Sequence, residues 1–196
     1  MAKFFGNLNL VVVVGVVLAL VIMLGLDAPS FDSSAACIKL TFVWLHVFFG
    51  VLWIGLLYYL NFVQVPTMPS IPAEQKGAIT GHIAPRVFWY FRYAALFTVI
   101  TGLIVAWNGG FLKLALMLAT PGKVRLIGVG MWLGLVMAFN VWFIIWPAQK
   151  KILGIIPATA EEKAKVAPWA LGASRTNFLL SIGMLYCMSA ANGVLG

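Results

Sequence analysis

Five long apolar stretches constrain this chain more than any other feature of its sequence. A helix rises 1.5 Å per residue, so about 20 apolar residues are needed to cross roughly 30 Å of hydrocarbon. The stretches of about that length are Leu8–Leu26, Leu40–Phe62, Val87–Trp107, Leu126–Trp146 and Asn177–Leu195. They predict an all-α polytopic membrane protein with five transmembrane helices.

The composition also indicates a membrane protein. Hydrophobic residues make up 63% of the chain and charged residues 9%, whereas soluble domains carry about 25% charge. Lys and Arg number 13 against 5 Asp and Glu, but they lie at the ends of the apolar runs, where they would meet lipid headgroups. The basic excess therefore does not indicate a nucleic-acid partner. Without tandem repeats or low-complexity linkers, we expect one integral membrane domain over residues 1–196.

The distribution of basic residues predicts the orientation in the membrane. Those on the amino-terminal side are Lys3, Lys76, Arg86, Arg92, Lys150, Lys151, Lys163, Lys165 and Arg175, and those on the other side are Lys39, Lys113, Lys123 and Arg125. The positive-inside rule then places the amino terminus in the cytoplasm and the carboxyl terminus outside. The first apolar core, Leu10–Leu26, is longer than a usual signal-peptide core, so we expect a retained helix.

Polar residues line up on the helices that follow the first. At 100° per residue, the second stretch places Lys39, His46, Gly50, Trp53, Asn61 and Gln64 within an arc of about 80°. One face of the third carries Tyr90, Ala94, Thr98, Thr101 and Asn108; one face of the fifth carries Asn177, Ser181, Met184, Met188 and Asn192; the fourth carries Asn140. Polar groups within hydrocarbon face protein or a cofactor. These faces predict a four-helix bundle of helices two to five, with the first helix peripheral.

His46 is the candidate metal ligand. Neutral imidazole is the commonest metal ligand, and haem is often held in the core of a helical bundle. Gly50, one turn onward, leaves room for a macrocycle, and Lys39 is a candidate partner for a propionate. Met188 and Thr101 are expected at a similar depth, and methionine with histidine suits haem iron or Cu(I). The alternative is a histidine that is only hydrogen-bonded between helices, with Met188 filling the core.

His82 precedes Pro85 in a predicted cytoplasmic loop and lies roughly 20–25 Å from His46 along the membrane normal at 1.5 Å per residue. The two histidines therefore cannot share one iron, and an interfacial loop histidine is favoured. The five acidic residues all lie in loops or at helix ends, which argues against a proton pump or an ion-coupled transporter. Any catalysis is expected to rest on a bound redox cofactor.

Four segments resemble, in order, the membrane domain of the bacterial urate hydroxylase (PuuD-type urate oxidase) family. They are Trp44–Gly55 continuing through Tyr58–Pro66, then Phe88–Ala94, Phe139–Lys151 and Ser174–Asn177. The match covers roughly residues 40 to 195. More distantly, the Leu45-His46, Gly50 and Trp53 pattern is similar to haem-b four-helix membrane proteins that include a protoporphyrinogen oxidase, whose haem ligand corresponds to His46.

The resemblance implies a haem-b redox protein of the bacterial inner membrane, with its carboxyl terminus in the periplasm. It also implies urate as a candidate substrate and a c-type cytochrome or partner complex as electron acceptor. Urate hydroxylases of this kind carry further helices and a cytochrome c with a CxxCH motif, which this sequence lacks. An oxidoreductase activity is therefore expected only within a complex. The segment Trp146–Lys151 is either an aromatic and basic interface anchor or an anion-binding or docking surface.

Two alternatives to the haem protein remain at this stage. The first is an accessory or structural subunit whose aromatic-rich helices pack against a larger membrane complex. The second is a copper-binding membrane protein that uses His46 and Met188, with Cys187 pointing about 80–100° away from the methionine face. A spectrum of the purified protein separates these functions.

Overall fold

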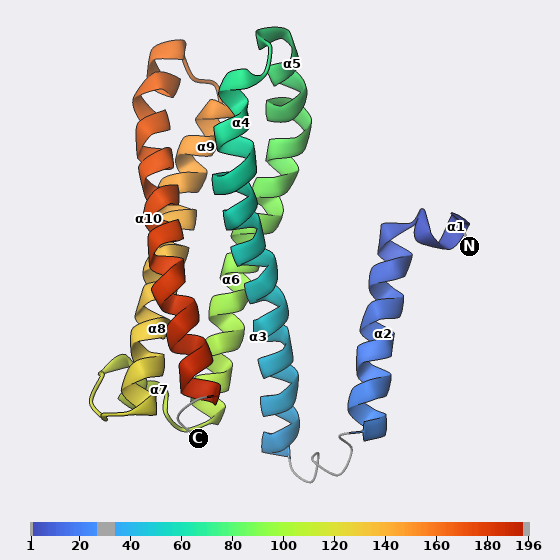
Figure 1. Cartoon of the computed structure of the whole chain (residues 1–196), viewed down its shortest axis with the longest axis vertical. Helices are drawn as coiled ribbons and strands as arrows, with labels where there is room; N and C mark the ends of the chain where they lie inside the picture. Colours follow the sequence, from blue (N-terminus) through green and yellow to red (C-terminus); the bar gives the residue numbers. More distant parts are fainter. Residues whose placement is uncertain (1, 27–33, 194–196) are drawn as a thin grey trace. The chain divides into compact units, whose positions relative to one another are not determined.

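A computed structural model describes the backbone of residues 2–26 and 34–193, and these residues are helical with connecting turns and no strand (Figure 1). The chain divides into two compact units, Met1–Thr41 and Phe42–Gly196, and each is described by itself. The predicted all-α fold is confirmed. The end of the fifth stretch at Leu195 lies outside the described residues, and the single domain stays a prediction.

The first unit holds α1 (Ala2–Phe5), α2 (Leu8–Leu26) and the start of α3 (Ser34–Tyr59). The bounds of α2 coincide with the first predicted stretch. Aliphatic side chains surround α2 on all sides, and none of its membrane-length window is buried. A helix that is apolar all round suits lipid or apolar protein surroundings. Its peripheral position relative to the bundle stays a prediction.

The second unit is a bundle of four long helical segments that run side by side (Figure 1). Two of them are α3 continued by η2 (Leu60–Gln64), α4 (Val65–Thr67) and η3 (Met68–Ser70), and α5 (Ala73–Ala78) continued by η4 (Ile79–Ile83) and α6 (Ala84–Asn108). The others are α8 (Lys123–Phe139) with η5 (Asn140–Ile145) and α9 (Trp146–Ile152), and α10 (Ala160–Gly193). The short α7 (Leu112–Leu116) lies near the start of α8. We call the two ends of this unit the α5 end and the α7 end.

Four helical segments in the described residues are long and apolar enough to cross a membrane: Leu8–Gly25, Ser34–Ser70, Ala73–Asn108 and Lys123–Ile152. They correspond to the first four predicted stretches. The described part of α10 is not among them, so the count of five spans is not confirmed. Helix α10 also begins at Ala160, well before the predicted Asn177, in a region expected to be a loop.

Three π-helical segments, η2, η4 and η5, share one sequence feature. Each ends two residues before a proline, namely Pro66, Pro85 or Pro147. After each segment the next backbone N–H bonds five residues back, as from Val65 to Leu60 and from Trp146 to Val141. Proline lacks an N–H and its ring clashes with the carbonyl four residues earlier, so a locally wider helix relieves the clash. The bundle therefore continues past these prolines without breaking.

Large side chains fill the centre of the bundle. Trp53 and Phe91 are each 1% exposed, and Met137 is fully buried. They belong to one cluster that draws on α3, α6, α8 and α10. In hydrocarbon, van der Waals packing and interhelical hydrogen bonds hold helices together. The four predicted helix faces thus meet in a single core.

Helix α10 begins with a reciprocal pair of cap hydrogen bonds. The Thr159 N–H donates to Glu162 Oε2 at 2.9 Å, and the Glu162 N–H donates to Thr159 Oγ1 at 3.2 Å. This pair satisfies two backbone donors at the helix start. The nearby Lys151 ammonium lies 3.5 Å from the Glu162 carboxylate. The hydrogen bond from Thr159 and the charge of Lys151 lower the pKa of Glu162 below its ordinary value.

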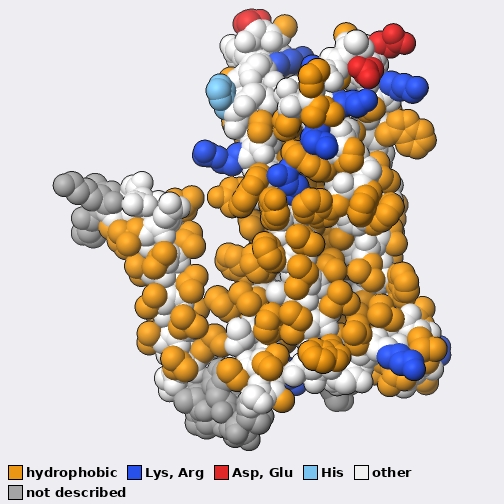
Figure 2. All heavy atoms as spheres, turned by 180° about the vertical axis from the view of Figure 1, so that it is seen from behind, with side chains coloured by type: hydrophobic (Ala, Val, Ile, Leu, Met, Phe, Trp, Pro, Cys, Tyr) orange, Lys and Arg blue, Asp and Glu red, His pale blue; other side chains and the backbone are white. Residues whose placement is uncertain are grey.

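Charges gather at the ends of the second unit, and apolar side chains cover the surface between them (Figure 2). Basic residues are concentrated toward the α5 end, where α5, α9 and the start of α10 lie. Among them are Lys76, Lys150, Lys151, Lys163 and Lys165. This pattern suits a bundle whose two ends meet water or lipid headgroups.

Candidate functional site

His46 lies on α3 against the backbone of α6. Its Nδ1 is 2.8 Å from the carbonyl oxygen of Thr98 and 3.4 Å from Thr101 Oγ1. The Thr101 hydroxyl donates instead to the carbonyl oxygen of Phe97 at 2.6 Å. A carbonyl oxygen only accepts, so His46 Nδ1 must carry the proton. In the neutral ring, Nε2 then keeps its lone pair, and it has no hydrogen-bond partner within the described part of the chain.

Gly102 allows the imidazole to lie this close to α6. A Cβ atom at Gly102 would be 2.8 Å from His46 Cε1 and 3.0 Å from His46 Nδ1. Contacts under 3.0 Å are essentially never seen for a real Cβ, so any larger residue would displace the ring. Gly50 also faces α6, with a built Cβ 3.9 Å from Thr98 Cγ2. We call His46, Thr98, Thr101 and Gly102 the histidine junction.

Three predicted site residues, His46, Gly50 and Thr101, are therefore brought together around Thr98. Trp53, a fourth, is buried farther along α3, and its indole N–H has no hydrogen-bond partner among the described residues. Leaving such a donor buried and unpaired costs about 1–3 kcal/mol. Trp53 is thus a buried donor about 10 Å along the helix from His46, at 1.5 Å per residue.

The structure places Met188 against α8. A Cβ at Gly130 would be 3.2 Å from the Met188 methyl carbon and 2.9 Å from Cys187 Cβ. Gly130 therefore permits the close approach of α10 to α8, and Met188 packs against the buried core. Its role as a ligand stays a prediction. Lys39 belongs to the first compact unit, and its role toward a propionate also stays a prediction.

A second polar contact lies deeper in the bundle, between α10 and its neighbours. Asn140 Nδ2 donates to Asn177 Oδ1 at 2.8 Å, and Asn177 Nδ2 donates to the Met137 carbonyl oxygen at 2.9 Å. Asn61 Nδ2 donates to Ser174 Oγ at 3.0 Å. We call these five residues the asparagine junction. Asn177 is fully buried, so the predicted inward face of the fifth helix is confirmed at this position.

Trp146, the first residue of the Trp146–Lys151 segment, packs against Arg92 of α6. The Arg92 guanidinium carbon lies 3.7 Å from the centre of the Trp146 ring, and the Trp142 indole N–H donates to the Arg92 carbonyl oxygen at 3.1 Å. Arginine stacks well on indole because the positive charge meets the negative face of the ring. One Arg92 nitrogen, Nη1, is buried with no hydrogen-bond partner in the described residues. Trp146 therefore stacks on a half-buried cation of the bundle.

The sequence did not lead us to predict that the Thr98 carbonyl oxygen accepts from His46, or that Gly102 makes room for the imidazole. Small residues four apart, Thr98 and Gly102, are a known signal for close helix approach in membranes. That signal was present on the third stretch. Tyr90 was predicted on the inward face of that stretch but is 43% exposed. It lies eight residues before Thr98, about 80° away at 100° per residue, so it falls at the edge of the face.

Comparisons with known proteins add no family assignment. No family model, no curated protein and no solved structure matches this chain. Within the described residues there is no group of three or more His, Cys, Asp and Glu side chains placed to hold a metal ion. The fold and site thus define a helical bundle with membrane-length helices and one half-buried histidine that joins two of them. The resemblance to urate hydroxylases stays a prediction.

Proposed function

We propose that this protein is an integral membrane redox protein that binds haem b through Nε2 of His46. The hydrogen bond from His46 Nδ1 to the Thr98 carbonyl oxygen carries this proposal. Metal-ligating histidines almost always donate their other ring N–H to a carbonyl or carboxylate, which fixes the tautomer and the ring orientation. The apolar stretches of this chain contain no carboxylate, so a backbone carbonyl takes that role.

The surroundings of His46 fit a single histidine ligand to haem. Gly102 lets the ring lie close against α6, and the carbonyl oxygen of Thr98 fixes which nitrogen carries the lone pair. The unpaired indole N–H of Trp53 would gain an acceptor from a polar group on a bound cofactor. Haem supplies one-electron transfer when it is bound. His46 would bind it, Thr98 would orient the ligand, and the aromatic core would exclude water.

The proposal also covers the electron acceptor and the orientation of the chain in the membrane. We infer that the amino terminus is cytoplasmic, because more Lys and Arg residues are expected on the amino-terminal side of the membrane than on the other side, and cytoplasmic loops carry the excess. The electron acceptor that the family resemblance suggests is a c-type cytochrome or partner subunit. Urate is the candidate substrate that the family resemblance suggests, for a complex rather than for this chain alone.

A difference spectrum tests the haem proposal. The full chain is expressed with sufficient haem, purified in detergent, and recorded oxidised and dithionite-reduced. We expect the reduced α-band of a b-type haem in the wild-type protein. His46→Ala removes the only proposed ligand nitrogen and should abolish the band. His82→Ala removes the other histidine of the chain and should leave the band unchanged, which makes it the matched control.

The second candidate function is a non-catalytic accessory subunit of a larger membrane complex. The same hydrogen bond favours it, since His46 also joins α3 to α6 as a purely structural histidine would. A colourless preparation whose His46→Ala variant loses only thermal stability would support this function and contradict the haem proposal. Copper on elemental analysis, lost in both His46→Ala and Met188→Leu, would support the copper site instead.

A further inference from the structure

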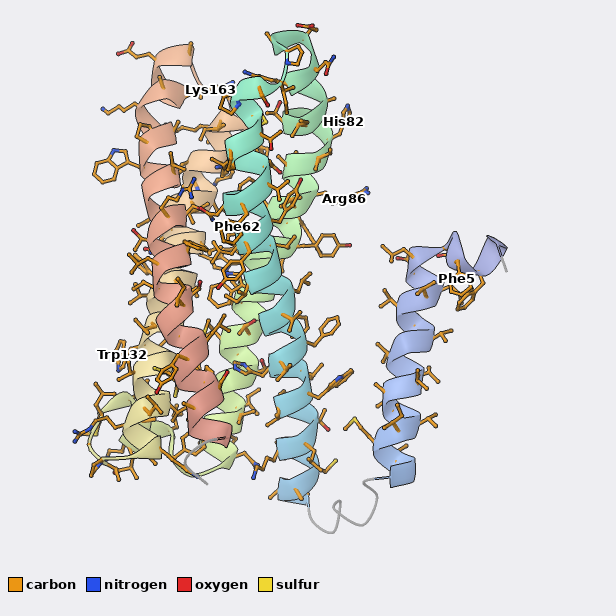
Figure 3. The ribbon with its side chains drawn as sticks, in the orientation of Figure 1. Phe5, Phe62, His82, Arg86, Trp132 and Lys163 are labelled. Atoms are coloured by element: carbon orange, nitrogen blue, oxygen red, sulfur yellow. The ribbon has the colours of Figure 1, made fainter. Side chains whose placement is uncertain are left out.

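A groove on the second unit lies between α3 and the start of α6, away from the histidine junction. Its volume is about 550 Å³, and Leu52 and Leu56 of α3 form one wall. His82 of η4 and Val87, Arg86 and Tyr90 of α6 form the other wall. Figure 3 shows His82 and Arg86 projecting from neighbouring turns on the same side of this helix. The groove is open toward the surroundings of the bundle.

The lining of the groove divides into a cationic part and an apolar part. His82 and Arg86 supply nitrogen donors, and Arg86 is always charged. Leu52, Leu56 and Val87 supply aliphatic surface. No Asp or Glu lies in this lining, and the described residues hold one ion pair, Lys151–Glu162, which lies elsewhere. The groove therefore combines uncompensated positive charge with a surface suited to a hydrocarbon chain.

The groove also lies at the depth expected for lipid headgroups. Trp89 and Tyr90 are 49% and 43% exposed, and their rings contact each other edge to face at 5.0 Å. Exposed Trp and Tyr mark the interface between hydrocarbon and water. Arg86, one turn before Tyr90, stands toward the α5 end, where the basic residues gather. Lys and Arg at this level are attracted to anionic lipids.

We propose that this groove binds an anionic phospholipid, with the phosphate at Arg86 and His82 and one acyl chain along Leu52, Leu56 and Val87. Charge complementarity selects this occupant. In a zwitterionic lipid the positive group of the headgroup offsets the phosphate charge that Arg86 would bind. A neutral quinone has no charge for Arg86 to bind. A free phosphate would leave the aliphatic wall without a partner. The site does not depend on haem binding at His46.

Native mass spectrometry of the detergent-solubilised full chain tests the lipid site. Wild-type protein is titrated with phosphatidylglycerol or phosphatidylcholine of the same acyl chains, and bound lipid is counted. We expect a clear preference for phosphatidylglycerol. One basic residue near an anionic surface contributes about a fivefold change in binding. Arg86→Gln should therefore weaken phosphatidylglycerol binding about fivefold, and the His82→Gln/Arg86→Gln double variant should weaken it further.

Controls separate this site from general charge effects. Arg175→Gln removes an exposed arginine on α10 outside the groove lining and should leave the preference unchanged. Arg86→Lys keeps the charge and should retain most of it. The proposal is overturned if Arg86→Gln matches Arg175→Gln or if both lipids bind equally. It is also overturned if inorganic phosphate or a quinone displaces the bound lipid, or if the groove proves to be covered by a second copy of the chain.

Discussion

The histidine junction and the asparagine junction are both interhelical polar contacts, but they differ in what they leave unused. In the asparagine junction, Asn177 uses both ends of its amide, because it accepts from Asn140 and donates to the Met137 carbonyl oxygen. The one atom left unpaired there within the described residues is the amide oxygen Oδ1 of Asn61. In the histidine junction, His46 uses one ring nitrogen and leaves the other with a lone pair. The Asn140–Asn177 pair is fully explained by helix association, because its hydrogen bonds join the two helices to each other. A half-buried imidazole with an unused nitrogen is also able to bind a metal.

The two junctions separate a polar residue that suggests a binding function from one that only joins helices. Both junctions depend on a close approach of helices, and both contain a side chain bonded to a backbone carbonyl. Amide side chains at the asparagine junction have no role in ligating haem iron. Haem iron is held by histidine, cysteine, methionine or tyrosine. The comparison therefore makes His46 the proposed cofactor ligand and Asn177 a residue of helix association.

The largest effect is expected from Gly102→Ala. The new Cβ would clash with His46 Cε1 at 2.8 Å, so the imidazole must move away from Thr98. We expect most haem to be lost and the bundle to be destabilised by about 1–3 kcal/mol through overpacking. Haem content per protein and thermal melting measure both effects.

Gly55→Ala is the matched control for Gly102→Ala. A Cβ at Gly55, also on a helix of the bundle, meets nothing within 4 Å. Alanine there should keep the haem and stabilise the helix by about 0.5–1 kcal/mol, because glycine is the poorer helix former. Equal haem content in the two variants would contradict the role assigned to Gly102.

An intermediate effect is expected from Asn177→Ala. This change leaves the Asn140 side-chain amide without its acceptor, and an unpaired buried group costs about 1–3 kcal/mol. The Met137 carbonyl oxygen loses the Asn177 donor but keeps a bond from the Asn140 backbone N–H. We expect lower thermal stability with an unchanged haem spectrum in the remaining folded protein. A double-mutant cycle with Asn140→Ala should give a coupling energy of about 1 kcal/mol. Haem loss as complete as in His46→Ala would remove the distinction between the two junctions.

The smallest effect is expected at the start of α10, the helix that carries Asn177. The pKa of Glu162 is lowered by its bond from the Thr159 N–H and by Lys151. Its carboxylate therefore stabilises the folded state fully above the ordinary pKa of glutamate, and this stabilisation is lost as pH falls through the lowered pKa. Thermal melting at about pH 6 and about pH 3 should show a smaller acid loss for Glu162→Gln than for the wild type.

Replacing Thr159 tests the same cap without a change of charge. Thr159→Val removes the hydroxyl that accepts from the Glu162 N–H and should cost about 1 kcal/mol at neutral pH. The haem spectrum should not change in either variant, because the cap lies at the α5 end and His46 does not depend on it. An identical acid loss in the wild type and Glu162→Gln would contradict the lowered pKa.

Two sequence features predicted much of the fold, namely the length of the apolar segments and the regular 100° rotation per residue of an α-helix. Length alone located α2 and the three following membrane-length segments. The 100° wheel also placed Trp53, Asn61 and Asn177 inward, and all three are buried. Trp53 and Asn177 lie within regular α-helix, where 100° per residue applies, and Asn61 is only the second residue of the π segment η2.

The remaining features depend on local exceptions to that geometry. The π segments before Pro66, Pro85 and Pro147 have more residues per turn than an α-helix. They therefore rotate the side chains that follow, and a constant 100° per residue does not include this rotation. Helix α10 was predicted too short because its first half is charged and contains Pro168. The Thr159–Glu162 spacing of a capping box was the available signal for its true start. Gly102 could not be paired with His46 because pairing requires the relative placement of α3 and α6.

Rescue by free imidazole tests most directly whether His46 is the haem ligand. His46→Gly creates space where the ring lies and removes the ligand nitrogen, so the purified variant should lack the b-type α-band. Added imidazole should restore the band in His46→Gly reconstituted with haem, with saturable dependence on imidazole concentration. His82→Gly should show the band without imidazole. A wild-type protein that binds no haem, or a His46→Gly variant that binds it fully without imidazole, would contradict the account.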